Sequence, residues 1–458
     1  MLISIIIPTL NEAEDLPATL ASLRRQMSDT EIIVCDGGST GRLLRPRRRR
    51  LLSSNAPRKR SATNNHFPLL QFEKTGKIQR PIKNKPEASM FDFFEPTSPF
   101  ASQTLRLVAE AQQGGGDVFD IARCVKRIEL GDKAGWEREW LALAAQTEKR
   151  ATDALAAGNK RTAMNNFFHA NQYYRMADVF LTGFDPKRAQ CFAKCQENFR
   201  NAAKLHTPKM DIIEVQCGDE TYDGYFCHPI DPAPGKWPAV FLIGGADAFA
   251  EEIYFSGRQI LNRGWALLLV DTPGRGSSMY LKGIETRPDY EVPTKPCIDY
   301  LVDRPEVDAD RIALMGISLA GYYAPRAAAF ELRLKALVSW SGCYSVLTDV
   351  YEWCEGLRPV IQRLLGGVDD AEARRRLAEF TMEGIAENIT CPTLISHGED
   401  DHLMHVEGAK RLYDEIGAAD KTLRLYDGKD GNGGAMHCSH DMWGYNVPFM
   451  LDWLEKRL

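Results

Sequence analysis

Residues 311–330, RIALMGISLAGYYAPRAAAF, decide how we interpret the rest of the chain. The apolar run at 312–315 follows the charged segment 308–311 and predicts a short buried strand. The small, alanine-rich residues from Gly321 onward predict a helix. Between the two lies a tight turn centred on Ser318. The sequence therefore predicts a serine hydroxyl at the point where a strand gives way to a helix.

The turn at 316–321, GISLAG, is close to G-x-S-x-G, the strand-to-helix turn that lifts a serine above the sheet of α/β-hydrolases. Such a serine adopts a strained backbone conformation, and bulky residues two positions away would collide with the adjoining strand and helix. Gly316 and Ala320 are both small, although Ala320 stands where the pattern has glycine. An ordinary glycine-rich turn would also explain these six residues, so the motif alone leaves the function open.

An acid and a histidine follow in the order that this class of hydrolase requires. The apolar segment 391–397, CPTLISH, predicts a strand, and the turn GEDDHLM after it offers Asp401, which fits the place of the acid better than Asp400. One more strand-like segment, 422–426, precedes a glycine-rich loop that ends AMHCSH. We expect His437 to be the base and hold His440 in reserve.

The C-terminal half alternates strands and helices. Segments 212–216 and 221–228 predict an antiparallel hairpin, and buried strands are expected at 238–243, 266–270 and 336–340. This pattern predicts an α/β fold with a doubly wound, mostly parallel sheet. The turn GGADAFAEE at 244–252 lies where such a fold needs oxyanion-hole donors, so the expected donors are the backbone N–H groups of Leu319 and of Gly245 or Ala246.

The bulk composition is that of a globular protein with room for two or three domains, with 458 residues, 44% of them hydrophobic and 26% charged. The net charge of -5 indicates no general nucleic-acid role. Eleven cysteines without paired zinc-type spacing favour a reduced, cytoplasmic protein. The first apolar run, 2–7, lacks a basic flank and breaks at Pro8, so neither a signal peptide nor a membrane span is predicted.

The first 41 residues resemble the opening strand, helix and strand of family-two glycosyltransferases. PTLNE at 8–12 and DGGS at 36–39 stand at the positions that hold the base and ribose of a nucleotide-sugar in that family. The segment 42–60 has nine basic residues and no acid, and could serve as a nucleic-acid patch or a localisation signal. We interpret residues 42–100 instead as a basic, disordered linker, because no apolar periodicity is sustained there.

Residues 101–207 predict a helical cap domain, and residues 208–458 the catalytic domain. Apolar residues recur at helical spacing from Trp136 to about residue 155 and again from Ala163 to about 181. A third helix is expected to begin with Asp185 as N-cap and Pro186 at its first position. The aromatic side chains of the second helix could line a substrate cavity or simply pack in a core; they are Phe167, Phe168, Tyr173 and Tyr174.

Taken together, residues 117–458 resemble the 2,6-dihydroxypseudooxynicotine hydrolase family and the related yellowish-green polyketide-shortening hydrolases and fermentation-respiration switch proteins. The motifs that carry the resemblance are the helical segment, GGAD, GISLAGYYAPRAAAFE, HGEDD and HCS. The resemblance implies an α/β-hydrolase fold with a helical domain over the site. It also implies a Ser-Asp-His hydrolase that cleaves a carbon–carbon bond next to a ketone.

Several alternatives stay open at this point. The chain could be a carboxylesterase or acyl-peptidase-like hydrolase, a non-catalytic α/β-hydrolase-like binding protein, or, from residues 1–41 alone, a glycosyltransferase. We expect no cofactor and no metal, because the pairs His402/His405 and His437/His440 are joined by no cluster of carboxylates or cysteines. The expected partner is a small ketone or ester substrate, contacted by Phe167 and Tyr174, with no nucleic acid or membrane partner; a homodimer is left open.

Overall fold

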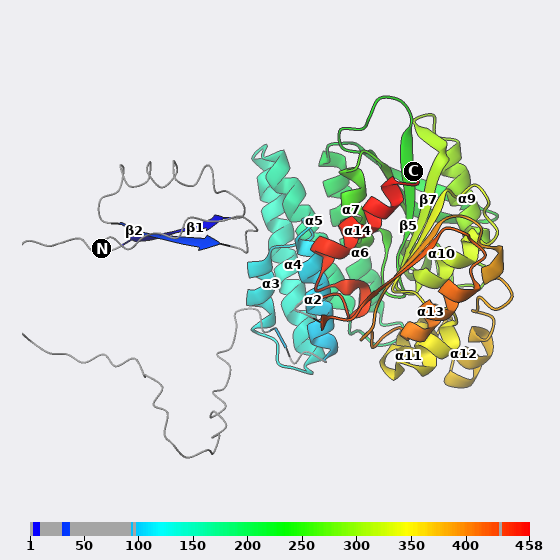
Figure 1. The fold of residues 1–458 in the computed structure, drawn as a ribbon. Coiled ribbons are helices and arrows are strands. Elements are labelled where there is room, and N and C mark those ends of the chain that lie inside the picture. Colours follow the sequence, from blue (N-terminus) through cyan, green and yellow to red (C-terminus); the bar gives the residue numbers. More distant parts are fainter. Residues whose placement is uncertain (1–2, 10–29, 37–92, 95–97, 430–432) are drawn as a thin grey trace, which may run out of the picture. The chain divides into compact units, whose positions relative to one another are not determined.

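The computed structural model describes residues 3–9, 30–36, 93–94, 98–429 and 433–458, so the basic segment 42–60 lies outside the described residues. Contacts divide the chain into two units, Met1–Lys83 and Asn84–Leu458. In the first unit, strands β1 (Ile3–Thr9) and β2 (Thr30–Asp36) pair in parallel, with Ile3 opposite Thr30. The second unit contains the elements described below (Figure 1).

Eight strands of the second unit form one sheet in the order β10-β9-β8-β7-β5-β6-β4-β3. The hairpin β3–β4 and the pair β4–β6 are antiparallel, and the other neighbours are parallel. The predicted doubly wound, mostly parallel sheet of the α/β-hydrolase fold is thereby confirmed. The strands are β3 (Met210–Cys217), β4 (Glu220–Cys227), β5 (Trp237–Ile243), β6 (Ala266–Val270), β7 (Val307–Ile317), β8 (Ala336–Trp340), β9 (Thr393–Gly398) and β10 (Lys421–Tyr426).

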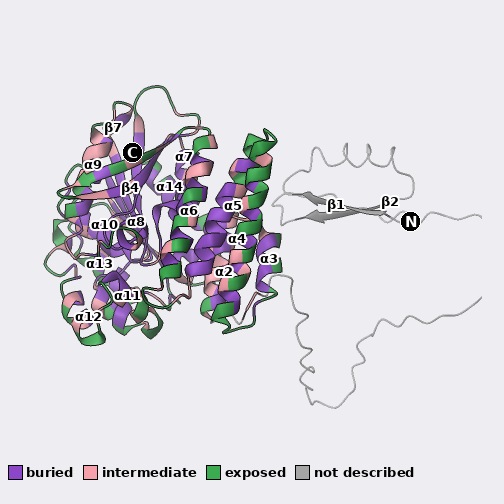
Figure 2. Cartoon of the chain, turned by 180° about the vertical axis from the view of Figure 1, so that it is seen from behind, coloured by how far each residue is buried: buried purple, intermediate pink, exposed green. Residues whose placement is uncertain are grey.

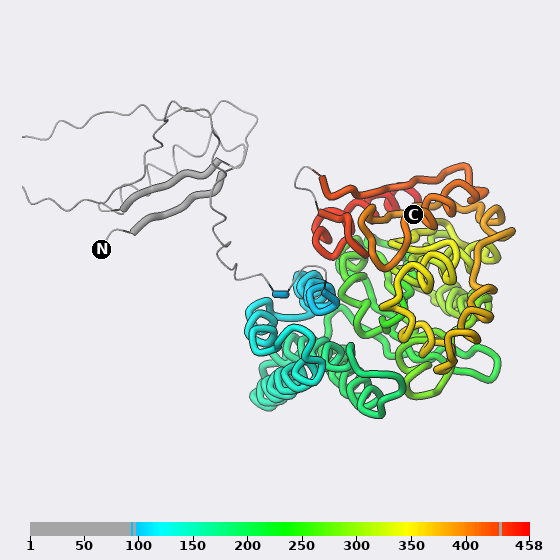
Figure 3. Tube along the Cα trace, turned by 90° about the horizontal axis from the view of Figure 1, so that it is seen from below, coloured from blue at the N-terminus to red at the C-terminus, as the bar shows by residue number. Residues whose placement is uncertain are grey.

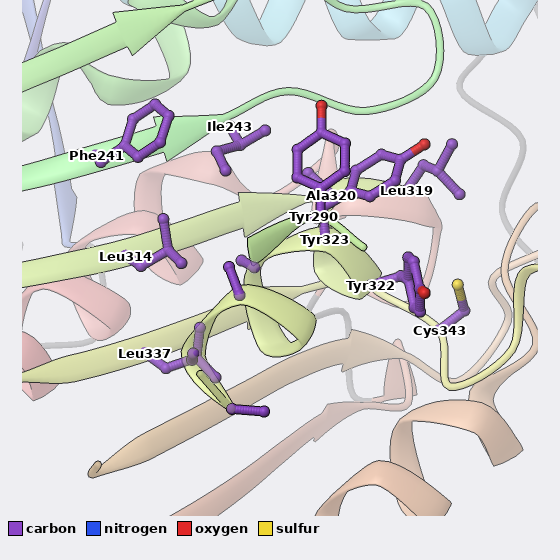
Figure 4. Packing of buried hydrophobic residues seen from close by; sticks show 14 of the residues in the cluster. Phe241, Ile243, Tyr290, Leu314, Leu319, Ala320, Tyr322, Tyr323, Leu337 and Cys343 are labelled. Carbon is purple, nitrogen blue, oxygen red and sulfur yellow. The ribbon is translucent and has the colours of Figure 1, made fainter. Parts of the chain in front are cut away.

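Helices bury both faces of this sheet, which is why its central strands are continuous apolar runs. Along β5, Phe241 and Ile243 pack with α9 and α10, in the cluster drawn in Figure 4, whereas Val240 and Leu242 pack with α7 and α14. Figure 2 shows the buried strands between partly exposed helices. The helices are α7 (Ala250–Leu261), α8 (Gly276–Tyr280), α9 (Glu291–Val302), α10 (Ala320–Ala328), α11 (Arg358–Leu364), α12 (Asp370–Leu377), α13 (Val406–Glu415) and α14 (Trp443–Glu455).

The segment before the sheet is helical, as expected. Its helices are α2 (Pro99–Ala111), α3 (Val118–Val125), α4 (Lys133–Ala156), α5 (Lys160–Asp178) and α6 (Pro186–Leu205), and Figure 3 shows them side by side at one flank of the second unit. Asp185 caps α6 as predicted by accepting a hydrogen bond from the Lys187 N–H at 2.9 Å. Helical structure starts earlier than expected, because Ser98 caps α2 by accepting from the Ala101 N–H at 3.1 Å. Among the described residues, no helix has the length and apolarity to cross a bilayer.

The turn after β7 depends on a close approach between two backbones. A Cβ atom added to Gly321 would lie 2.3 Å from the Cα of Gly342, which follows β8. The Ser339 hydroxyl donates to the Gly321 carbonyl at 2.9 Å and fixes the same contact. Since neither backbone is free to move away, this packing requires glycine.

We therefore expect Gly321→Ala to lower the free energy of unfolding by about 1–3 kcal/mol through overpacking. The measurement is chemical denaturation with the melting temperature as a second readout. Gly444→Ala in α14 is the matched control, because nothing lies within 4 Å of the added Cβ. Equal stability of the two variants would contradict the packing argument.

Candidate active site

Ser318 occupies a strained turn between β7 and α10. Its φ angle is +61°, in the left-handed region that non-glycine residues rarely adopt. The Ser318 N–H donates to the Trp340 carbonyl at 2.8 Å, which ties the turn to β8. A Cβ atom at Gly316 would lie 2.0 Å from the Ala320 carbonyl oxygen, so the turn admits no side chain there. Ala320 itself is fully buried, and its methyl group is accommodated where the hydrolase pattern has glycine.

Three side chains from distant parts of the chain meet at this turn. The Ser318 Oγ lies 2.8 Å from the His437 Nε2, and the His437 Nδ1 lies 2.7 Å from the Asp401 Oδ2. Asp401 follows β9, and His437 lies in the loop between β10 and α14. The three groups thus form one hydrogen-bonded series from serine to carboxylate, while Asp400 is exposed and His440 makes no hydrogen bond with the series.

Asp401 is held as a buried, oriented anion. Its Oδ1 accepts from the backbone N–H groups of Leu403 and Met404, each at 2.9 Å. The Nε2 of the buried His397 lies 3.5 Å from the Asp401 Oδ2. Burial disfavours the charge, but His437 and the backbone donors outweigh this effect and lower the pKa of Asp401. The carboxylate is therefore available to orient the imidazole.

The two histidines of the loop have opposite electrostatic settings. Burial alone would lower the pKa of His437, but the Asp401 carboxylate more than compensates, so that pKa is raised well above its ordinary value. Burial, Arg106 and His437 lower the pKa of His440 well below its ordinary value. The two rings are 6.4 Å apart, centroid to centroid. His437 is thus a strong proton acceptor, and His440 is a neutral neighbour.

Backbone donors surround the serine. A Cβ atom at Gly245 would lie 2.8 Å from the Ser318 Oγ, so the turn after β5 approaches the hydroxyl directly. In the described part of the chain, the N–H groups of Leu319, Gly245 and Ala246 donate to no protein acceptor. Groups of this kind can receive the negative charge that develops on a carbonyl oxygen under attack.

Arginines of the helical segment hold the turn that carries these donors. Arg106 of α2 donates to Asp247, which follows Ala246, at 2.9 and 3.0 Å, and it also pairs with Glu252. Arg175 of α5 lies 3.2 Å from the same Asp247 carboxylate. Burial opposes the charge of Asp247, but the two arginines lower its pKa far below the ordinary value. These pairs could not be predicted from the sequence, because α2 was not expected and the partners are more than seventy residues apart.

Phe167 and Tyr174 are packed inside the protein, with 2% and 7% of their surfaces exposed. The Tyr174 hydroxyl donates to Glu148 of α4 at 2.6 Å. Phe168 stacks on Tyr254 of α7, and Tyr173 packs against Trp140 of α4. These contacts favour the packing role that the sequence left open, and substrate contact by Phe167 or Tyr174 stays a prediction. Within the described ranges, no group of three or more His, Cys, Asp or Glu residues is placed to hold a metal.

Comparison with protein families agrees with this fold. A family profile described as Esterase FrsA-like matches residues 127–355, and one described as Serine aminopeptidase, S33 matches 372–430. A short match to Glycosyl transferase family 2 covers residues 4–51. The last match agrees in place with the resemblance noted for residues 1–41.

Individual relatives are fungal hydrolases. The chain is 31% identical to alpha/beta hydrolase xenA of Xenoacremonium sinensis, over 66% of this chain and 82% of the relative. It is 29% identical to alpha/beta hydrolase gkaG of Penicillium citrinum, over 73% and 87% of the respective chains. Among solved structures, 2,6-dihydroxy-pseudo-oxynicotine hydrolase matches with a TM-score of 0.68 at 26% identity, over 77% of this chain and 95% of that chain. The expected relationship to this group of hydrolases is confirmed.

Gly245→Ala tests the approach of the β5 turn to Ser318. The new methyl group would collide with the serine side chain and push the backbone donors out of place. We expect the rate of Ser318 labelling by a fluorophosphonate probe to fall about 100-fold, the usual cost of losing one such donor. Gly444→Ala is again the matched control, and an undiminished labelling rate in Gly245→Ala would contradict the arrangement.

Proposed function

Because the chain belongs to the FrsA-like esterase family, we propose that it is a serine hydrolase in which Ser318 is the nucleophile, His437 the base and Asp401 the orienting acid. The observation that carries this proposal is the hydrogen-bonded series from the Ser318 Oγ through His437 to Asp401. The same three residue types in the same order perform acyl transfer on this fold.

The reaction would proceed through an acyl-enzyme. His437 takes the Ser318 proton as the Oγ attacks the substrate carbonyl, and Asp401 supports the imidazolium that forms. The oxyanion meets the N–H groups of Leu319 and of Gly245 or Ala246. His437 then gives its proton to the leaving group. A water molecule, deprotonated by His437, attacks the acyl carbon and releases the carboxylic acid, and Ser318 recovers its proton.

We propose that the bond broken is a carbon–carbon bond next to a ketone, as in a β-diketone or aryl ketone. In a β-diketone the electron pair of the broken bond leaves as an enolate, which His437 protonates on carbon to give a ketone. In an aryl ketone the pair stays on the ring carbon, and protonation by His437 gives the arene. The support comes from the family resemblance and from the 26% identity to 2,6-dihydroxy-pseudo-oxynicotine hydrolase. Ester hydrolysis is the second candidate, favoured by the description of the family as esterases.

The remaining alternatives have weaker support. A binding protein without catalysis has no use for an unpaired set of oxyanion donors beside a hydrogen-bonded serine. A glycosyltransferase would rest on the match at residues 4–51 alone. The cysteines whose side chains the structure describes are all free, which supports the proposal of a reducing, cytoplasmic location.

The pH profile should report on His437. The base must be neutral to accept the serine proton, so kcat/KM should rise with pH through a pKa above 6.5, the ordinary histidine value. Asp401→Asn removes the carboxylate that raises this pKa and leaves the burial that lowers it. We expect the rising limb to move to lower pH and the plateau to fall by about four orders of magnitude.

Asp400→Asn is the control for this profile, because Asp400 is the exposed neighbour of Asp401. Asp400→Asn should change neither the pH at which kcat/KM rises nor the plateau value of kcat/KM. A profile that shifts equally in both variants would contradict the assignment of Asp401.

The bond broken is tested with benzoylacetone and phenyl acetate, which can deliver the same acetyl group to Ser318. The product mixture is followed by mass spectrometry. If carbon–carbon hydrolysis is the activity, the diketone and water give acetic acid and acetophenone, or benzoic acid and acetone, with a kcat/KM at least tenfold above that of the ester. Ser318→Ala should lose both reactions and also fluorophosphonate labelling. Rapid ester cleavage with no ketone product would leave an esterase.

A further inference from the structure

A buried arginine at the boundary between the helical segment and the sheet domain has a side-chain N–H without a hydrogen-bond acceptor, although its charge acts on Asp178, Asp247 and Tyr280. Arg363 of α11 is 5% exposed. Its Nε is buried without a hydrogen-bond partner. By contrast, Arg106, Arg175 and Arg188 each have a carboxylate oxygen within 3.2 Å. Burying a guanidinium without a partner is costly, so its persistence points to a missing anion.

Arg363 lies where the helical segment meets α11. The loop between α5 and α6 closes on this region, because a Cβ atom at Gly367 would lie 2.5 Å from the Phe184 ring. Next to Arg363 in the chain, the Leu364 carbonyl accepts from the Thr286 N–H at 2.9 Å, which anchors the end of α11. Figure 1 shows α11 and α2 toward the same lower side of the view. The arginine is thus held at the seam between the two parts.

Asp247 connects this arginine with the serine. The charge of Arg363 is among those that lower the pKa of Asp247, so the two groups are close enough to interact. Asp247 follows Ala246 in the turn that approaches Ser318, and its side chain is 34% exposed. Asp247 thus connects the turn beside Ser318 with the charge of Arg363.

The seam holds a cluster of buried charges. Four arginines gather there with four carboxylates; they are Arg106, Arg175, Arg188 and Arg363 with Glu110, Asp178, Asp247 and Glu252. Burial, and then Glu252, raise the pKa of Glu110 well above its ordinary value and favour its neutral form. A neutral Glu110 weakens the negative charge around the arginines, which favours an anionic ligand beside Arg363.

We propose that Arg363 binds an anionic oxygen of the substrate, either a carboxylate or the enolate of a 1,3-dicarbonyl group. This inference rests on the proposed function, since it places the bound substrate between Ser318 and Arg363. An enolate at this place would carry the charge of the departing carbon. A carboxylate would instead mark the far end of the acyl or leaving group.

The test is protection of Ser318 from a fluorophosphonate probe by two anions and two uncharged analogues. Benzoate is compared with benzamide, and dimedone, which ionises to an enolate near neutral pH, with cyclohexanone. We expect at least one anion to protect Ser318 at a concentration about tenfold or more below that of its uncharged analogue. A hydrogen bond between charged groups changes a binding constant by about that factor or more. The ratio of protecting concentrations, uncharged compound to anion, is compared between the two pairs. The pair with the larger ratio shows whether the site prefers a carboxylate or an enolate.

Arg363→Gln should reduce this ratio about tenfold or more, whereas Arg375→Gln should retain it. Arg375 is the matched control because it is exposed on α12 and pairs with Glu372 at 2.7 Å. Equal protection by charged and uncharged compounds in the wild type, or an unchanged ratio in Arg363→Gln, would overturn the proposal. If Arg363→Gln does not fold, Arg363→Lys replaces it and the wild-type ratio still decides. If the wild type is not labelled at all, the assignment of Ser318 as the nucleophile is wrong. Calorimetric titration with benzoate and dimedone then tests the anion site directly.

Discussion

The close contact between the backbones at Gly321 and Gly342 is the constraint on which the site depends. It brings the first turn of α10 against the end of β8, directly after Ser318, whose backbone is left-handed. The hydrogen bond from the Ser318 N–H to Trp340 completes the turn. The next N–H, that of Leu319, has no protein acceptor, as the proposed role of an oxyanion donor requires. Strand β8 supplies no side chain of the hydrogen-bonded series, but it fixes the backbone that carries Ser318 and Leu319.

The helical segment contributes to the site through charge. Its Arg106 and Arg175 bind the carboxylate that directly follows the turn beside Ser318. Buried ion pairs of this kind add little net stability, but breaking one leaves a costly unpaired charge, so they fix a single arrangement. The turn with Gly245 and Ala246 is therefore held from the side of the helices and not only by the sheet.

The sequence predicted what is local or periodic. The strands were found because residues such as those of β5 are buried on both faces and read as continuous apolar runs. Ser318, Asp401 and His437, which the structure joins by hydrogen bonds, could be singled out because each stands in a short motif placed in order along the fold. Arg106 and Arg363 could not be found in this way. The partner of Arg106 is 141 residues away, and an arginine in a short amphipathic helix is ordinarily solvated. The start of α2 was missed although Ser98 and Pro99 are a helix-start signal, since the preceding residues carry no periodicity.

The raised pKa of His437 affects the protonation of an ester's leaving group and of a diketone's leaving group differently. A raised pKa makes His437 a better acceptor of the Ser318 proton and a weaker acid afterwards. An alkoxide that leaves an ester is basic enough to take that proton on the atom that departs. An enolate holds its charge mainly on oxygen, away from the carbon that must be protonated, so its departure depends on a second positive group. Within the described residues, His437 is fixed by Asp401 and Arg106 and Arg175 are neutralised by carboxylates. Arg363 is a buried cation near Asp247 whose Nε has no acceptor, and it could therefore bind the enolate oxygen. Whether the enzyme breaks a carbon–carbon bond thus depends on what Arg363 binds.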